Sequence, residues 1–171
     1  MKLLARIRSI DVDPSVLPGD YASYKSRMAG RAIIFDDHKV ALIHVQKSGY
    51  YMLPGGGLDG ENIEAGLARE VREELGCTIE LVRSLGAAEV YFDRWRQKQT
   101  DHCFVAWKIG ACAPAALTDF ERDEGYQAIW APTLQGAIAL VEAAVPAALD
   151  GKMVRARDLL FLKAAARQAV S

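Results

Sequence analysis

The sequence predicts an α/β or α+β fold, a sandwich built on a mixed, partly antiparallel β-sheet with helices on its faces. Segments rich in Ile, Val, Phe, Tyr and Trp, which favour strands, alternate with segments whose apolar residues recur every three or four positions, as on one face of a helix. The chain has 171 residues, 51% hydrophobic and 25% charged. This size and composition allow one domain with a well-buried core.

The first strands are expected after a polar stretch. Residues 1–30 contain prolines and glycines among polar side chains and are interpreted as an N-terminal extension. Residues 31–171 are then expected to form one domain that includes the C-terminal helices. Short apolar runs separated by turn residues predict its first three strands, at residues 31–35, 39–45 and 50–53.

From residue 61 to residue 75 the pattern becomes helical. Ile63, Leu67, Val71 and Leu75 recur every four positions and form one apolar stripe. Gly76 follows as a typical helix stop. The rest of the chain predicts strands around 78–92, 100–109 and 126–130, a polar connection at 93–98, a loop at 110–123, and helices near 133–145 and 152–168.

Charge and cysteine content argue against several function classes. The formal net charge is −1, so nothing favours binding to long nucleic acid. Because no apolar stretch approaches a signal-peptide core or a membrane span, we expect neither a targeting segment nor a membrane partner. The three cysteines, Cys77, Cys103 and Cys112, form no CxxC motif. We therefore expect no disulfide framework and no zinc site, and a reducing cytoplasm as the compartment.

Three glutamates on the expected helix indicate a metal site. Glu70 lies three positions before Glu73 and four before Glu74, so the three carboxylates project toward one side. Like charges at this spacing destabilise an isolated helix by about 0.2–0.5 kcal/mol per pair. Mg²⁺ is a suitable counter-ion, because it prefers hard oxygen ligands together with substrate phosphates. A solvated surface helix is the alternative, and the three residues alone do not exclude it.

A glycine-rich turn precedes this helix. Gly55, Gly56 and Gly57 let the backbone approach a ligand closely and expose its amides and carbonyls. Arg69 lies beside the acidic residues and can orient carboxylates by bidentate hydrogen bonds. A metal held between the carboxylates and the turn is suited to polarising a diphosphate and activating water.

The whole segment resembles the Nudix box, Gly-x5-Glu-x7-Arg-Glu-U-x-Glu-Glu-x-Gly-U, in which U is a bulky aliphatic residue. Two departures are the cysteine at the last position and a turn one residue shorter than usual. Flanking segments before the helix and near residues 129–132 also resemble the family, so the resemblance spans about residues 30–145. The residues in register are Gly55, Glu61, Arg69, Glu70, Val71, Glu73, Glu74, Gly76 and Cys77.

The resemblance implies a Nudix-type α/β/α sandwich and a Mg²⁺-dependent pyrophosphohydrolase, with Mn²⁺ as an alternative metal. Glu61 would support the geometry between turn and helix. The implied metal ligands are Glu70, Glu73, Glu74 and the Gly55 carbonyl, and the implied catalytic residues are Arg69, Glu70 and Glu73. A further catalytic glutamate is implied in the loop before the last strand, where Glu121 and Glu124 are the candidates. We prefer Glu124, because it directly precedes the strand.

Substrate recognition must come from residues outside the box. Tyr51 is a candidate for stacking on a base, and Arg94 and Arg96 are candidates for contacts with phosphates. Aromatic residues in β-rich domains are more often core residues, and a basic hairpin is more often solvated. We expect a small nucleotide-like substrate, and a nucleoside triphosphate, ADP-ribose, a nucleotide sugar and a dinucleotide all remain open.

Two other classes share this fold. A nucleotide-sensing module without catalysis is expected to lose box carboxylates, which this chain retains. An isomerase would need additional Cys and Glu acid–base groups, and nothing in the sequence marks them. For the assembly we expect a homodimer, since symmetric dimers are the commonest oligomers.

Overall fold

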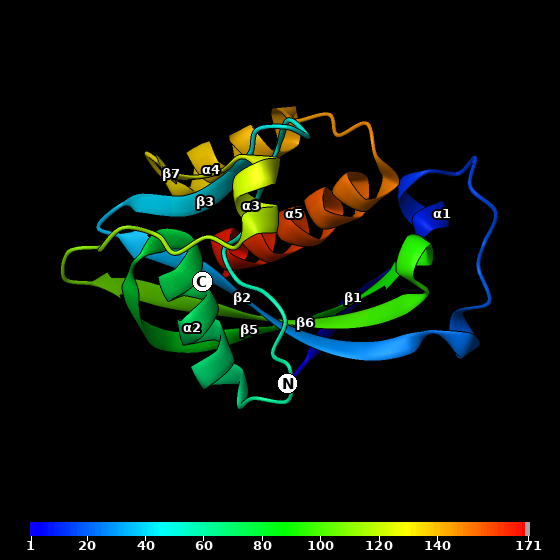
Figure 1. Ribbon diagram of the computed structural model, residues 1–171, viewed down its shortest axis with the longest axis horizontal. Coiled ribbons are helices and arrows are strands. Elements are labelled where there is room, and N and C mark those ends of the chain that lie inside the picture. Colours follow the sequence, from blue (N-terminus) through cyan, green and yellow to red (C-terminus); the bar gives the residue numbers. More distant parts are fainter. Residues whose placement is uncertain (170–171) are drawn as a thin grey trace.

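The computed structural model describes residues 1–169, which form one mixed sheet between helices (Figure 1). The strand order is β1-β5-β6-β2-β3-β4, with β7 paired to β3. Pairs β1–β5 and β2–β6 are parallel and the others are antiparallel. The strands are β1 (Leu3–Ile7), β2 (Lys25–Asp36), β3 (Lys39–Val45), β4 (Tyr50–Met52), β5 (Thr78–Phe92), β6 (Gln97–Ile109) and β7 (Tyr126–Ala131).

The helices cover both faces of this sheet. They are α1 (Ser9–Val12), α2 (Ile63–Leu75), α3 (Asp119–Glu124), α4 (Leu134–Ala143) and α5 (Leu149–Ala169), with short 3-10 helices η1 (Tyr21–Ser23) and η2 (Asp93–Trp95). Within residues 1–169, none of these helices is long and apolar enough to span a bilayer.

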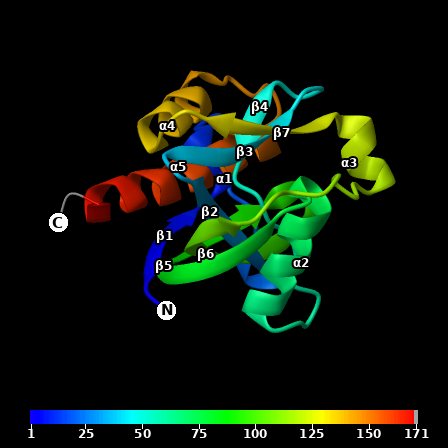
Figure 2. The same ribbon diagram turned by 90° about the vertical axis from the view of Figure 1, so that its left-hand side faces the viewer.

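Alternation along β2 sends neighbouring side chains to opposite faces, and each face has its own helical cover. Ile34 packs in a cluster with Leu67 and Val71 of α2. Ile33 packs in a second cluster with Phe161 of α5 and with residues of α4. Figure 2 shows α2 on one side of the sheet and α4 and α5 on the other. These three layers confirm the expected fold class.

The sheet divides next to β2. This strand pairs with β6 along its length but with β3 only at its last two residues. Residues 54–57, here called the glycine turn, occupy the remaining edge. Gly30 N donates to Gly56 O at 2.9 Å, and Ala32 N donates to Pro54 O at 3.0 Å. Backbone hydrogen bonds therefore anchor the turn to a central strand.

Two strands begin earlier than the sequence predicted. β2 starts at Lys25 rather than at residue 31, and β6 starts at Gln97 rather than at residue 100. A domain boundary between residues 30 and 31 would fall inside β2, and β1 joins the sheet beside β5. Gly30 suggested a loop, but a Cβ there would lie 3.1 Å from the Cβ of Leu67. The glycine instead makes room for α2 to cross the strand.

The segment expected as a loop, 110–123, contains the start of helix α3. Glu121 N donates to Thr118 Oγ1 at 3.3 Å, and Thr118 N donates to the Glu121 carboxylate at 2.7 Å. This reciprocal pair is a capping box, and Gly125 ends the helix. The loop prediction was therefore wrong, although the Thr-x-x-Glu spacing in the sequence is a recognisable helix start.

The expectation of no disulfide is also wrong, because Cys77 and Cys112 are joined. Their Cα atoms lie 4.3 Å apart although 35 positions separate them in the sequence. Cys77 directly follows α2, and the loop after β6 runs along that helix end, where Ala113 N donates to Gly76 O at 2.9 Å. Cys103 is free and buried. The argument from cysteines for a reducing compartment therefore fails.

Candidate active site

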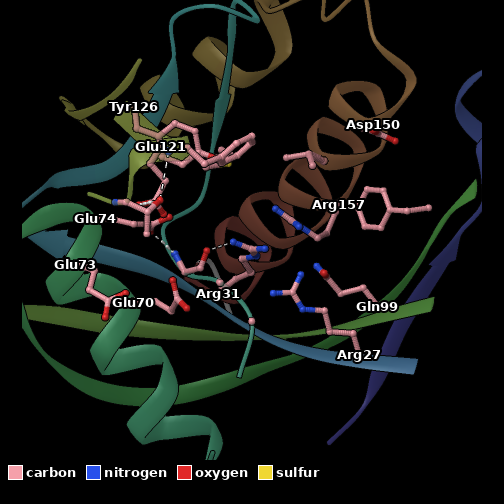
Figure 3. A pocket seen from close by; sticks show the side chains of 18 of the residues that line it. Arg27, Arg31, Glu70, Glu73, Glu74, Gln99, Glu121, Tyr126, Asp150 and Arg157 are labelled. Atoms are coloured by element: carbon pink, nitrogen blue, oxygen red, sulfur yellow. Dashed lines mark hydrogen bonds between the residues drawn. The ribbon is translucent and has the colours of Figure 1, made fainter. Parts of the chain in front are cut away.

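Helix α2 carries the acidic residues of the site and has both ends capped. Asn62 Oδ1 accepts from Glu64 N at 2.9 Å, and Gly76 closes the helix with a left-handed φ of 69°. The apolar stripe of the helix faces the sheet. Its acidic residues lie at the flank that borders the glycine turn (Figure 3).

Arg69 links the acidic residues of α2 to the glycine turn. Its guanidinium pairs with Glu61 at 2.9 Å, with Glu70 at 3.0 Å and with Glu73 at 3.1 Å. It also donates to the carbonyl of Gly57 at 3.2 Å. One cation thus positions two helix carboxylates relative to the turn. The catalytic role expected of Arg69 stays a prediction.

Glu74 is the buried member of the set, with 4% of its surface exposed. Its carboxylate accepts the backbone N–H of Gly55 at 2.7 Å. Burial raises the pKa of Glu74 to about 8, while the Gly55 hydrogen bond and the Arg31 charge act in the opposite direction. Such a carboxyl keeps its proton near neutral pH unless a cation binds to the carboxylate and favours loss of the proton.

Glu70 lies directly against the glycine turn. A Cβ on Gly56 would overlap the Glu70 carboxylate, so only glycine leaves room for this contact. Desolvation raises the pKa of Glu70 above its ordinary value, although the charge of Arg69 opposes the shift. Turn and helix together form a cradle lined by carboxylate oxygens.

Glu121 of α3 completes a group with Glu70 and Glu74, here called the carboxylate cluster. One carboxylate oxygen from each residue lies within 4.8 Å of the others. Hard oxygen donors of this kind fit Mg²⁺ or Mn²⁺, and a cation would relieve the repulsion among them. Glu73, also expected as a ligand, lines the same pocket but is not part of this cluster.

Glu124, which the sequence analysis preferred to Glu121, lies apart from the cluster. Its carboxylate pairs with Lys47 at 3.4 Å and accepts from the Ser48 hydroxyl at 3.4 Å. The physical reason is the capping box of α3, which fixes Glu121 at the start of the helix and leaves Glu124 at its last residue. Of the two candidates, the fold brings Glu121 to the other carboxylates.

Gly55, expected to offer its carbonyl to a metal, lines the pocket. Its carbonyl oxygen already accepts a hydrogen bond from Arg31 Nη1. A cation at this oxygen would compete with a guanidinium, so the carboxylate cluster is the better supported site. The ligand role of Gly55 stays a prediction.

None of the three residues expected to bind substrate is among those that line the pocket beside the carboxylate cluster, and their role stays a prediction. Tyr51 stacks on His44 with ring centroids 4.6 Å apart. Arg94 pairs with Asp150 at 3.8 Å, and Arg96 donates to the Ser23 hydroxyl at 2.7 Å. The pocket beside the carboxylate cluster is lined by other side chains, among them Asp150, the partner of Arg94.

This pocket has a volume of about 550 Å³ and extends from the carboxylate cluster past the glycine turn to α5. Sequence reasoning missed its basic and aromatic lining, because these residues come from separate strands and helices and form no local motif. Figure 3 shows the glutamates at one end and the arginines nearer α5. The missed residues include Arg27, Arg31, Gln99, Phe120, Tyr126 and Arg157.

Comparisons with known proteins identify the family and the fold of this chain. The family model of the NUDIX domain matches residues 25–145. Similar solved structures include the E. coli ORF135 protein (18% identity, 88% of this chain and 96% of that chain covered, TM-score 0.62). A MutT protein from Methanosarcina mazei Go1 is also similar, with 18% identity, 87% of this chain and 99% of that chain covered, and a TM-score of 0.61. A UDP-X diphosphatase has 16% identity, 92% of this chain and 69% of that chain covered, and a TM-score of 0.55. At these identities the likeness concerns the fold. No curated protein matches.

Proposed function

The chain belongs to the NUDIX domain family and is a hydrolase of phosphorus-containing anhydrides. We propose that it cleaves the diphosphate linkage of a small nucleotide-like substrate and uses Mg²⁺ as its metal. One observation carries the proposal: Glu70, Glu74 and Glu121, from two helices, bring carboxylate oxygens together beside the glycine turn. Compared with the expectation from the sequence, this proposal takes Glu121 in place of Glu124, leaves the Gly55 carbonyl out of the metal ligands, and gives Glu73 the role of base alone.

In the proposed reaction each side chain has one task. Glu70, Glu74 and Glu121 would hold the metal, which when bound neutralises charge on the phosphate oxygens. Arg69 keeps Glu73 in place beside the cluster. A water molecule gives its proton to the Glu73 carboxylate, and its oxygen forms a bond to one phosphorus. The bond from that phosphorus to the bridging oxygen then breaks.

The first test removes the buried ligand. Glu74→Gln keeps the shape of the side chain and an acceptor for Gly55 N, but its neutral amide binds Mg²⁺ far less well than a carboxylate. We expect Mg²⁺-dependent kcat/KM to fall at least about 100-fold, the upper range for loss of a group that merely supports a ligand. Phosphate release is measured against a nucleoside triphosphate, ADP-ribose and a UDP-sugar.

The matched control is Glu64→Gln, which makes the same change at an exposed position in the first turn of α2. It should retain activity. Hydrolysis that continues undiminished in Glu74→Gln would refute the assignment. If the wild-type protein binds nucleotides but hydrolyses none of the panel, the chain is a sensing module instead.

A further inference from the structure

The pocket has a second charged region, formed by arginines from β2 and α5. Arg27 and Arg31 are four residues apart on β2 and therefore project from the same face of the strand. Arg157 of α5 reaches the same region, and Figure 3 shows the three side chains converging at the centre of the pocket. We call these three residues the arginine wall.

The arginine wall has more positive charge than its own partners neutralise. Arg31 Nε donates to Asp101 at 2.9 Å, and Arg157 Nη1 donates to the same carboxylate oxygen at 3.2 Å. Arg157 Nε also pairs with Asp158 at 2.8 Å. Three guanidinium groups thus share two carboxylates. Within residues 1–169, the side chain of Arg27 makes no hydrogen bond or ion pair.

Arg157 provides an independent sign that this region binds an acceptor group. Its side chain is only 1% exposed, yet its Nη2 has no hydrogen-bond partner among the described residues. Buried polar groups are nearly always paired, so an unpaired guanidinium nitrogen at a pocket wall indicates an acceptor that the protein itself does not supply.

The position of Arg27 connects this region to the reaction site. Its guanidinium lies over Gly57, where a Cβ would overlap it, and Arg69 donates to the carbonyl of the same glycine. The arginine wall and the carboxylate cluster therefore meet at the glycine turn. A chain of phosphates at the cluster can extend to Arg27 along this turn.

We infer that the arginine wall is a subsite for a phosphoryl group, separate from the metal site. A phosphoryl group offers several acceptor oxygens and up to two negative charges, which match the planar donors of guanidinium groups. This inference rests on the proposed function, in that the phosphoryl group belongs to the substrate. It favours nucleoside triphosphates, whose third phosphate would occupy the wall, over nucleoside diphosphate sugars.

The first experiment measures binding of inorganic phosphate by calorimetry to the full chain in excess chelator, so that no metal site contributes. We expect saturable binding that Arg27→Met weakens about 10–100-fold, the effect of losing hydrogen bonds to a charged group. Lys25→Met is the control, because it removes one charge from an exposed position on the same strand outside the pocket. Arg157 is not substituted, since its loss would leave Asp101 and Asp158 buried with fewer partners.

No saturable binding by the wild-type chain, or equal weakening in both variants, would overturn the subsite. Because this assay needs no turnover, phosphate binding without any hydrolysis would refute the proposed function alone. Hydrolysis without phosphate binding would refute the subsite alone.

The second experiment identifies the source of the phosphoryl group. KM is compared in Mg²⁺ for a nucleoside triphosphate and a UDP-sugar, in Arg27→Met and in Lys25→Met. A rise of about 10–100-fold for the triphosphate alone supports a third phosphate at the wall. A rise for both substrates keeps the subsite but assigns it to the diphosphate itself, which overturns the preference for triphosphates. No rise for either substrate overturns the inference.

Discussion

Glu73 differs from the other helix carboxylates because it lines the pocket without joining the carboxylate cluster. Its side chain is 38% exposed and is held by Arg69 at 3.1 Å. We predict that Glu73→Gln lowers kcat by about 10²–10⁴-fold, because an amide cannot accept the proton of the attacking water. Steady-state kinetics at saturating Mg²⁺ measure this loss.

Metal affinity separates the roles of Glu73 and Glu74. By calorimetry, Mg²⁺ should bind Glu73→Gln nearly as well as the wild-type chain and should bind Glu74→Gln much more weakly. An equal loss of Mg²⁺ affinity in the two variants would contradict the division and place Glu73 among the ligands.

Residues of the site were predictable where they are close in sequence. Glu70, Glu73 and Glu74 share one helix, so helical periodicity alone places them together. Arg157 and Asp101 lie 56 positions apart and meet only because α5 packs against the sheet. No local pattern contains that contact, and the arginine wall was therefore missed.

At the scale of elements, helix α3 and the loop before it control where Glu121 lies. The Cys77–Cys112 disulfide ties this loop to the end of α2, and Ala116 N donates to Glu73 O at 2.7 Å. We predict that reduction by dithiothreitol lowers the free energy of unfolding by about 2–4 kcal/mol, because the cross-link restricts the unfolded chain. Urea unfolding of the oxidised and the reduced protein measures this difference in the free energy of unfolding.

The same reduction should weaken Mg²⁺ binding, since Glu121 then depends on fewer tethers. Cys112→Ser provides the control: it should resemble the reduced protein and be insensitive to dithiothreitol. If mass spectrometry finds the disulfide but reduction changes neither unfolding nor Mg²⁺ affinity, the tether has no role in positioning Glu121.

Strands and long helices of this chain were predictable, whereas its short and tertiary-dependent elements were not. β3, β5 and α2 follow from apolar periodicity, which needs only neighbouring residues. The start of β2 was missed, because residues 25–28 are exposed and show no apolar run. Their strand conformation comes from pairing with β6, a contact distant in sequence.

On the scale of the whole molecule, a buried ion network connects α5 to the glycine turn. Asp158 accepts from Leu53 N at 2.9 Å, Arg157 bridges Asp158 and Asp101, and Arg31 runs from Asp101 to the Gly55 carbonyl. Gly55 N in turn donates to Glu74. Protonation at Glu74 is therefore coupled to the packing of the fold, and the free energy of unfolding should depend on whether Glu74 carries a proton.

Glu74 makes the stability of the metal-free protein depend on pH. Its pKa is raised from 4.5 to about 8 in the folded chain. Its contribution to the free energy of unfolding is therefore fully present below pH 4.5, where the folded and the unfolded chain both carry the proton. Between these values the unfolded chain releases the proton and the folded chain keeps it, so stability falls as pH rises, by up to about 1.4 kcal/mol per pH unit. Mg²⁺ should reverse this trend, because it binds the deprotonated carboxylate and stabilises the folded state more at higher pH.

Thermal unfolding in chelator from about pH 5 to pH 8 tests this pH dependence by comparing the wild-type chain with Glu74→Gln, whose side chain does not titrate. The difference in Tm between the two proteins should change steadily across this range, and parallel Tm curves would show that burial of Glu74 is not linked to stability.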